Sequence, residues 1–222
     1  MFLATHLVGF GSGGAAGSSI YVYEATPFAA NASNYTFSNF NTGSAGSLLV
    51  LCVIANQAAS SLSVSSVTVN GVAATINVQT YGNNGSSLAL ASAIASIVSP
   101  GGNQSVVIGF GSSASRGLCV NGYNVSGLSS STPYHTATGS GNAVTSVSCS
   151  LNVPDSGVAI ATTGSNITEA ITLSGLSTDR NAALSGLGWA TGSNQNLAAQ
   201  TGRSISGAGS SGVRSIVAAS WA

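Results

Sequence analysis

The chain has 222 residues, of which only 4% are charged, and its four arginines balance its four acidic residues without a single lysine. Soluble domains ordinarily contain about 25% charged residues. With zero net charge no basic face exists to neutralise phosphates, so nucleic-acid binding is disfavoured, and no run approaches the ~20 apolar residues of a transmembrane helix. A hydrophobic content of 44% argues against a disordered chain.

Residues 1–17 are predicted to form an N-terminal arm with a flexible tether. The tip, 1–10, is mildly apolar, and a stretch of Gly, Ala and Ser follows it. Strand addition to a neighbouring subunit is one way in which such a tip docks. The side chains expected to make that contact are Phe2, Leu3, Leu7, Val8 and Phe10. A first strand followed by a long loop is the alternative.

Short alternating patterns predict strands at 20–24 and 35–38, and the longest apolar run follows them. That run, Ser47–Ala55, contains three β-branched residues and shows no alternation. A continuous apolar run of this length indicates a strand that is covered on both faces. We therefore place Ser47–Ala55 in the middle of a sheet, with protein above and below it.

A hairpin is predicted over Ser65–Val78, where Asn70-Gly71 is the preferred pair for a type I′ turn. Further strands are expected at 88–98, 106–110 and 118–125, the last with a bulge or turn at Asn121-Gly122.

The second half of the chain begins with a polar loop, 129–141, and a half-buried strand over 143–153. A core run at 158–162, weaker strands between 169 and 211 and a closing strand at 213–221 complete the pattern. No amphipathic helix is evident, so parallel βαβ units are excluded. Residues 18–222 are predicted to form one all-β domain, an antiparallel β-sandwich of the jelly-roll kind.

Cys52, Cys119 and Cys149 are odd in number and widely spaced, which fits no metal signature. We interpret them as buried free thiols, although a Cys119–Cys149 disulfide stays open. The glycines of 9–14 match a dinucleotide-binding pattern, but no helix follows them, so no cofactor is expected.

Catalytic motifs are weak. The sequence has no G-x-S-x-G elbow, and His135 with Asp155 and a serine would form only a coincidental trio. A β-sandwich glycoside hydrolase would need two carboxylates in one cleft, whereas Asp155 and Asp179 are expected in turns. The chain is therefore predicted not to be an enzyme.

Three side chains are candidates for contact with host-surface glycans, because aromatic rings stack on sugars and binding loops lie at the ends of sandwiches. They are Tyr134, His135 and Trp189, all in predicted loops. The alternative is that these rings cap the core.

Edge strands are normally guarded, often by lysine, and this chain has none to place there. We therefore expect neighbouring subunits or loops to cover the edges.

The arrangement resembles small all-β virion proteins of tailed bacteriophages and related prophages. The stretches that carry the resemblance are Tyr35–Ala55, the Ser65–Val78 hairpin, Gly127–Thr136, Asn152–Ala161 and Val213–Trp221. It implies a capsid decoration (cement) protein, a head fibre or part of a tail fibre, made in the host cytoplasm and located in the virion. Its partners would be further copies of itself, as a homotrimer, and other virion proteins such as the major capsid protein. The resemblance implies no catalytic or cofactor residues.

Overall fold

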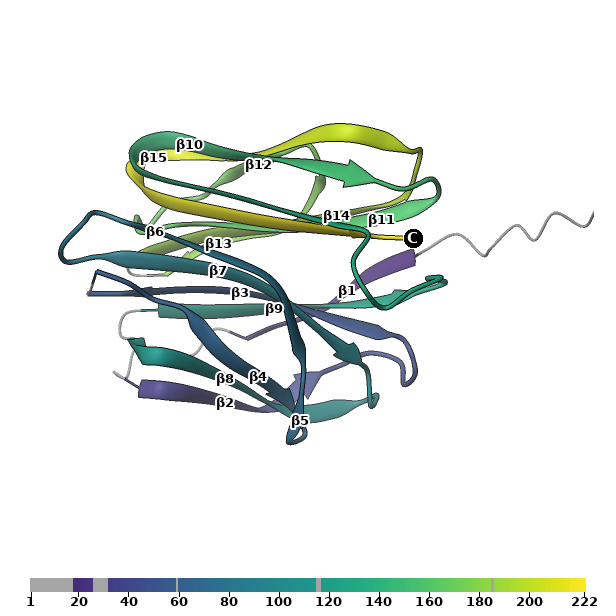
Figure 1. Ribbon diagram of the computed structural model, residues 1–222. Coiled ribbons are helices and arrows are strands. Elements are labelled where there is room, and N and C mark those ends of the chain that lie inside the picture. The colour runs from purple at the N-terminus through teal and green to yellow at the C-terminus, as the bar shows by residue number, and fades with distance from the viewer. Residues whose placement is uncertain (1–17, 26–31, 59, 115–116, 185) are drawn as a thin grey trace, which may run out of the picture.

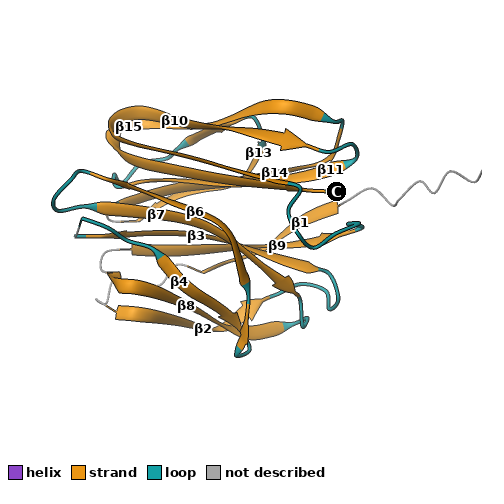
Figure 2. Cartoon of the chain, viewed as in Figure 1, coloured by secondary structure: helices purple, strands orange, loops and turns teal. Residues whose placement is uncertain are grey.

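The computed structural model describes residues 18–25, 32–58, 60–114, 117–184 and 186–222. These residues form strands joined by loops and turns, and no helix is present among them (Figure 2). Within this part of the chain, accordingly, no helix is available to cross a membrane. The strands pair antiparallel in three sheets, which confirms the all-β sandwich prediction. The proposed arm, 1–17, lies outside the described residues.

The middle sheet has five strands in the order β1-β9-β3-β7-β6 (Figure 1). Their bounds are Ser18–Ala25 for β1, Gly117–Ser126 for β9, Leu48–Gln57 for β3, Ala89–Val98 for β7 and Thr75–Asn83 for β6.

The lower sheet has the order β2-β8-β4-β5. Its bounds are Ala32–Asn41 for β2, Asn103–Ala114 for β8, Val64–Val69 for β4 and Val72–Ala73 for β5. From β1 to β9 the chain alternates between the middle and lower sheets, apart from the hairpins β4–β5 and β6–β7. Such alternation is what a jelly roll requires, and the jelly-roll designation stays our interpretation of this order.

The upper sheet has the order β10-β15-β11-β14-β13, and β12 pairs with β15. The bounds are His135–Val153 for β10, Gln200–Trp221 for β15, Gly157–Ser165 for β11, Leu187–Leu197 for β14, Ser177–Leu184 for β13 and Thr172–Ser174 for β12. The long ribbon of β10 and β15 doubles back over β11 and β14 (Figure 1). A side chain at Gly207 would come within 2.3 Å of Thr163 Oγ1, so this return packs very closely.

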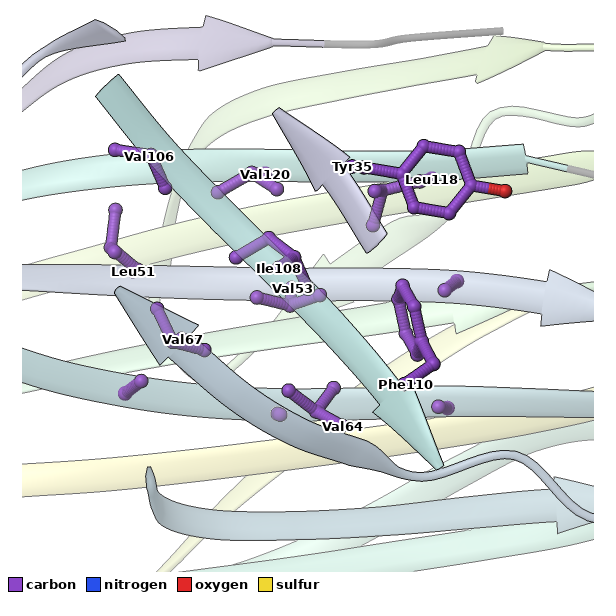
Figure 3. Close-up of a cluster of buried hydrophobic side chains, with 14 of the residues drawn as sticks. Tyr35, Leu51, Val53, Val64, Val67, Val106, Ile108, Phe110, Leu118 and Val120 are labelled. Atoms are coloured by element: carbon purple, nitrogen blue, oxygen red, sulfur yellow. The ribbon is translucent and has the colours of Figure 1, made fainter. Parts of the chain in front are cut away.

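All ten residues of β3 are buried, as the unbroken apolar run predicts. Because successive side chains of a strand point to opposite faces, β3 contributes to two cores. Leu51 and Val53 lie against Ile108 of the lower sheet (Figure 3). On the other face, Cys52 packs against the upper sheet in one cluster and Ile54 does so in the next.

The predicted hairpin is correct at its turn and wrong in its second arm. Asn70 and Gly71 have φ values of 49° and 78°, as a type I′ turn requires. The returning strand β5 has only two residues, and the chain then crosses to the middle sheet, where β6 pairs with β7. Local alternation could not distinguish these two pairings.

Three further expectations need correction. The loop 129–141 ends early, because β10 begins at His135. Asn121-Gly122 neither turns nor interrupts β9, and the register shift lies in its partner β1, between Tyr21 and Tyr23. Asp179 lies in β13 and not in a turn.

The three cysteines are free and buried, as predicted. Burial raises the pKa of the Cys52 thiol to about 12 and that of Cys149 to about 11. At neutral pH both sulfurs are therefore protonated and pack as small apolar groups.

Because β3 supplies both cores, truncation on either of its faces should destabilise the whole molecule. We expect Leu51→Ala and Ile54→Ala each to lower the free energy of unfolding by about 2–5 kcal/mol. Denaturant titration followed by far-UV circular dichroism and by tryptophan fluorescence checks this, and both signals should report one transition.

The control is Val72→Ala at the exposed β4–β5 turn, which should change the free energy of unfolding by less than about 0.5 kcal/mol. Two separate transitions in wild type would show that the upper sheet folds independently of the lower one.

Candidate functional site: an uncharged groove at the C-terminal end of β9

A groove of about 490 Å³ lies where β9 ends and β3 begins. Two short segments form it, 44–48 on the approach to β3 and 124–131 at the end of β9. Val98, the last residue of β7, completes the lining. We call this the β9 groove.

Side-chain hydrogen bonds fix the two walls of the β9 groove to each other. The Asn124 amide donates to the carbonyl of Thr42, at 3.1 Å, and to the hydroxyl of Ser47. Gly43 has a φ of +73°, and a side chain there would come within 2.6 Å of Asn124. Glycine is needed at this position for both reasons.

The outer wall is tied to the end of β15. The backbone N–H of Ser129 donates to the Ala222 carbonyl at 2.7 Å, and the indole N–H of Trp221 donates to the Ser131 carbonyl at 3.3 Å. Figure 1 shows this loop beside the C-terminal end of β15. Trp221 is fully buried, so the last residues of β15 are held in the sheet.

A second depression of about 280 Å³ continues the β9 groove toward β6, and Leu48, Val98 and Ser131 line both. Val98 is 61% exposed, which is unusual for a large apolar side chain in a protein whose other valines mostly face the core. No charged side chain lines either depression. The surface therefore offers hydroxyls, amides and apolar contacts, and it suits an uncharged ligand or chain segment.

The three candidate glycan contacts do not form one site. Tyr134 is 59% exposed and lies just beyond the groove wall, where its N–H donates to the Ser220 carbonyl. His135 begins β10 and is half-buried, with Nδ1 accepting a bond from the Asn152 N–H. Trp189 lies in β14 and is 1% exposed, so its assignment to a loop was wrong and it cannot stack on a glycan.

A polar depression of about 300 Å³ lies beside β13, and no sequence pattern indicated it. Its lining is Ser177, Asp179, Ser193, Asn194 and Gln195. The Asp179 carboxylate accepts hydrogen bonds from the Tyr123 hydroxyl at 3.0 Å and from the Ser193 hydroxyl at 2.8 Å. Burial raises the pKa of Tyr123 well above its usual value, and nearby Cys52 and Asp179 raise it further. The phenol therefore stays a hydrogen-bond donor and does not act as a base.

A buried ion pair lies at the bend of the β10–β15 ribbon. Arg214 is fully buried, and its Nη2 donates to Glu169 at 2.5 Å and to the Ser210 carbonyl at 2.6 Å. Its Nε donates to the Val144 carbonyl at 3.2 Å, next to Ala143, whose φ is +54°. Arg214 thus holds together the irregular residues at which the ribbon turns back.

The positions of the carboxylates decide whether a described depression could serve as a glycosidase cleft or a metal site. Glu169 is held by Arg214 and by the Ser210 N–H, and Asp179 lines a depression to which Glu169 does not contribute. None of these three depressions is lined by two carboxylates, as a glycosidase cleft would be. Among the described residues, no group of three His, Cys, Asp or Glu could hold a metal ion.

No protein-family model matches the chain, and no curated protein does. Among solved structures it is similar to a chain named "Red Clover Necrotic Mosaic Virus", with 11% identity and a TM-score of 0.24, over 89% of this chain and 88% of that one. A chain named "BspA_C_WT" shows 13% identity and a TM-score of 0.20, over 77% and 75%. At these TM-scores the likeness carries no argument.

The ion pair should make stability depend on pH. Burial raises the pKa of Glu169, but hydrogen bonds from Ser210 and Ser165 and the charge of Arg214 outweigh it, so the pKa lies below its ordinary 4.5. A carboxyl whose pKa is lower in the folded state stabilises that state above its unfolded pKa, and loses this effect as pH falls through the folded pKa.

We therefore expect Glu169→Gln to lower the free energy of unfolding by about 3 kcal/mol at pH 7, because it leaves Arg214 buried without its counter-charge. The difference from wild type should shrink as the pH drops below 4.5. Urea titration at pH 7 and pH 3 measures both values. Asp155→Asn, which removes an exposed carboxylate in a turn, is the control and should stay within about 0.5 kcal/mol of wild type. A pH-independent difference for Glu169→Gln would contradict this account.

Proposed function

We propose that this chain is a structural protein of a tailed-bacteriophage virion, which decorates or stabilises the capsid through contacts between subunits. The observation that carries the proposal is the lower sheet. Between Glu24 and Arg116 the sequence contains no Asp, Glu, Lys, Arg or His, and all four strands of the lower sheet fall in this stretch. The cores of stable interfaces are likewise depleted of charge.

The outer face of the lower sheet is built from small polar side chains. Thr36 and Thr68 flank Val107 in register, and Asn34 and Ser66 flank Gly109 in the same way. On the inner face, their neighbours along each strand point into the core. This leaves an uncharged surface of mainly hydroxyl and amide groups, which can pack against a second such surface without desolvating a charge.

The edge of the lower sheet supports the same proposal. Among the described strands, β2 pairs only with β8, and its ten residues include neither a charged residue nor proline. Natural proteins usually protect an edge of this length with lysine, proline or a cover. We propose that a neighbouring subunit covers it, in a homotrimer or at the contact with the major capsid protein.

A glycan-binding fibre module is the second candidate. It is favoured by Tyr134, an exposed ring next to the uncharged, hydroxyl-lined β9 groove. Trp189 no longer supports it. A glycan array tests this candidate, since binding should be present in wild type and absent in Tyr134→Ala.

The assembly proposal predicts that charge placed on the β2 face blocks association. We expect Thr36→Lys/Ser38→Lys to weaken self-association at least tenfold, because lysines from facing subunits would repel each other and lose water. Sedimentation velocity measures the oligomer, and co-sedimentation with purified capsids measures attachment.

The matched control is Thr172→Lys/Ser174→Lys, which places two lysines at the same spacing on the exposed face of β12. It should associate as wild type does. A wild-type chain that stays monomeric at all concentrations and does not attach to capsids would overturn the proposal.

A further inference from the structure

Asparagine followed by glycine is the dipeptide in which asparagine most easily loses its side-chain amide. The backbone nitrogen of the glycine attacks the amide carbon, and the missing side chain of glycine leaves its approach unhindered. The sequence contains three such pairs, which begin at Asn70, Asn84 and Asn121. Because the three pairs share the same chemistry, the structure around each of them decides which one reacts.

The pair at Asn121 is protected by the middle sheet. Asn121 is fully buried in β9, which is paired with β1 on one side and with β3 on the other. Its side-chain amide also donates to Cys119 Sγ at 3.0 Å. Ring closure would require the backbone at Asn121 to rotate out of its extended conformation and to break the pairing on both sides.

The pair at Asn84 is exposed, but both of its reacting groups are held. The amide oxygen of Asn84 accepts hydrogen bonds from the backbone N–H groups of residues 86–88, at 3.0 to 3.2 Å. The N–H of Gly85, which would be the attacking group, donates instead to the amide oxygen of Asn83 at 3.1 Å. These bonds hold the attacking nitrogen and the amide carbon in separate interactions.

The pair at Asn70 has neither form of protection. Asn70 and Gly71 are exposed at the β4–β5 turn, and a side chain at Gly71 would meet nothing within 4 Å. Within the described part of the chain, no hydrogen bond or ion pair holds the side chain of Asn70. The turn must open before the glycine nitrogen can reach the amide carbon. Opening is easy here, because β5 has two residues and only two residue pairs join it to β4.

We propose that Asn70 is a site of spontaneous deamidation, at which the folded protein acquires a negative charge with time. The nitrogen of Gly71 bonds to Cγ of Asn70, and the Cγ–Nδ2 bond breaks. Ammonia leaves with the proton of the Gly71 nitrogen, and a succinimide ring remains. Water then adds to one of the two ring carbonyls and breaks its bond to nitrogen, which yields aspartate or isoaspartate.

The product would change the surface on which the assembly proposal depends. Asn70 joins the last two strands of the lower sheet, in the stretch between Glu24 and Arg116 that contains no Asp, Glu, Lys, Arg or His. A carboxylate at this position would be the first charge in that stretch. Its effect on contacts between subunits rests on the proposed function, whereas the reaction itself does not.

Peptide mapping of the full chain tests the proposal. Purified protein is incubated at mildly alkaline pH, and mass spectrometry after chymotrypsin digestion follows the exchange of NH for O at each of the three pairs. We expect Asn70 to react at least about tenfold faster than Asn84 or Asn121, because only its pair opens by a small local motion. The same chain in guanidinium chloride is the matched control, in which the three pairs should react at comparable rates.

The variant Asn70→Gly removes the reactive amide and keeps a pair that also forms a type I′ turn. Isoelectric focusing should show an acidic form that accumulates in wild type and not in this variant. Rates are also measured in Thr36→Lys/Ser38→Lys, in which association through the lower sheet is expected to be blocked. Reaction at Asn70 in that variant supports the proposal whether or not wild type associates, so the two proposals fail separately. Equal rates at the three pairs of the folded variant, or a faster reaction at Asn84 or Asn121, would overturn it.

Discussion

The fold depends on one central strand that is covered by protein on both faces. Strand β3, in the centre of the middle sheet, is buried along its full length and sends alternate side chains into the cores above and below it. Both outer sheets thus pack against the middle sheet, and separating either of them from it would expose apolar surface to water. This arrangement leaves only the outer faces and edges of the stack for contact with other molecules.

The few charges of the chain have unequal roles. Arg214 and Glu169 form a largely buried pair that holds the bend of the β10–β15 ribbon, and Asp179 anchors the phenol of Tyr123. Such buried pairs contribute little net stability, but they penalise any alternative in which one partner is left alone. The strands of the lower sheet contain no charged residue. This is the feature from which we propose that the lower sheet contacts neighbouring subunits.

The sequence predicted most of the strands because burial sets their periodicity directly. The unbroken run of β3, the alternation in β10 and the Asn70-Gly71 turn all have local causes, and each is found as expected. The partners of the strands could not be predicted in the same way. Whether β6 pairs with β4 or β7 depends on contacts distant in sequence, and so does the burial of Trp189 by the middle sheet.

The β9 groove had no sequence signature, because serines and glycines line it and these are common throughout the chain. Imaging the protein in its native assembly by electron cryomicroscopy tests the central claim most directly. The account predicts that the uncharged outer face of the lower sheet, or the β2 edge, is buried against a neighbour in every copy. Copies in which both lie in solvent, with contacts made by the upper sheet, would contradict it.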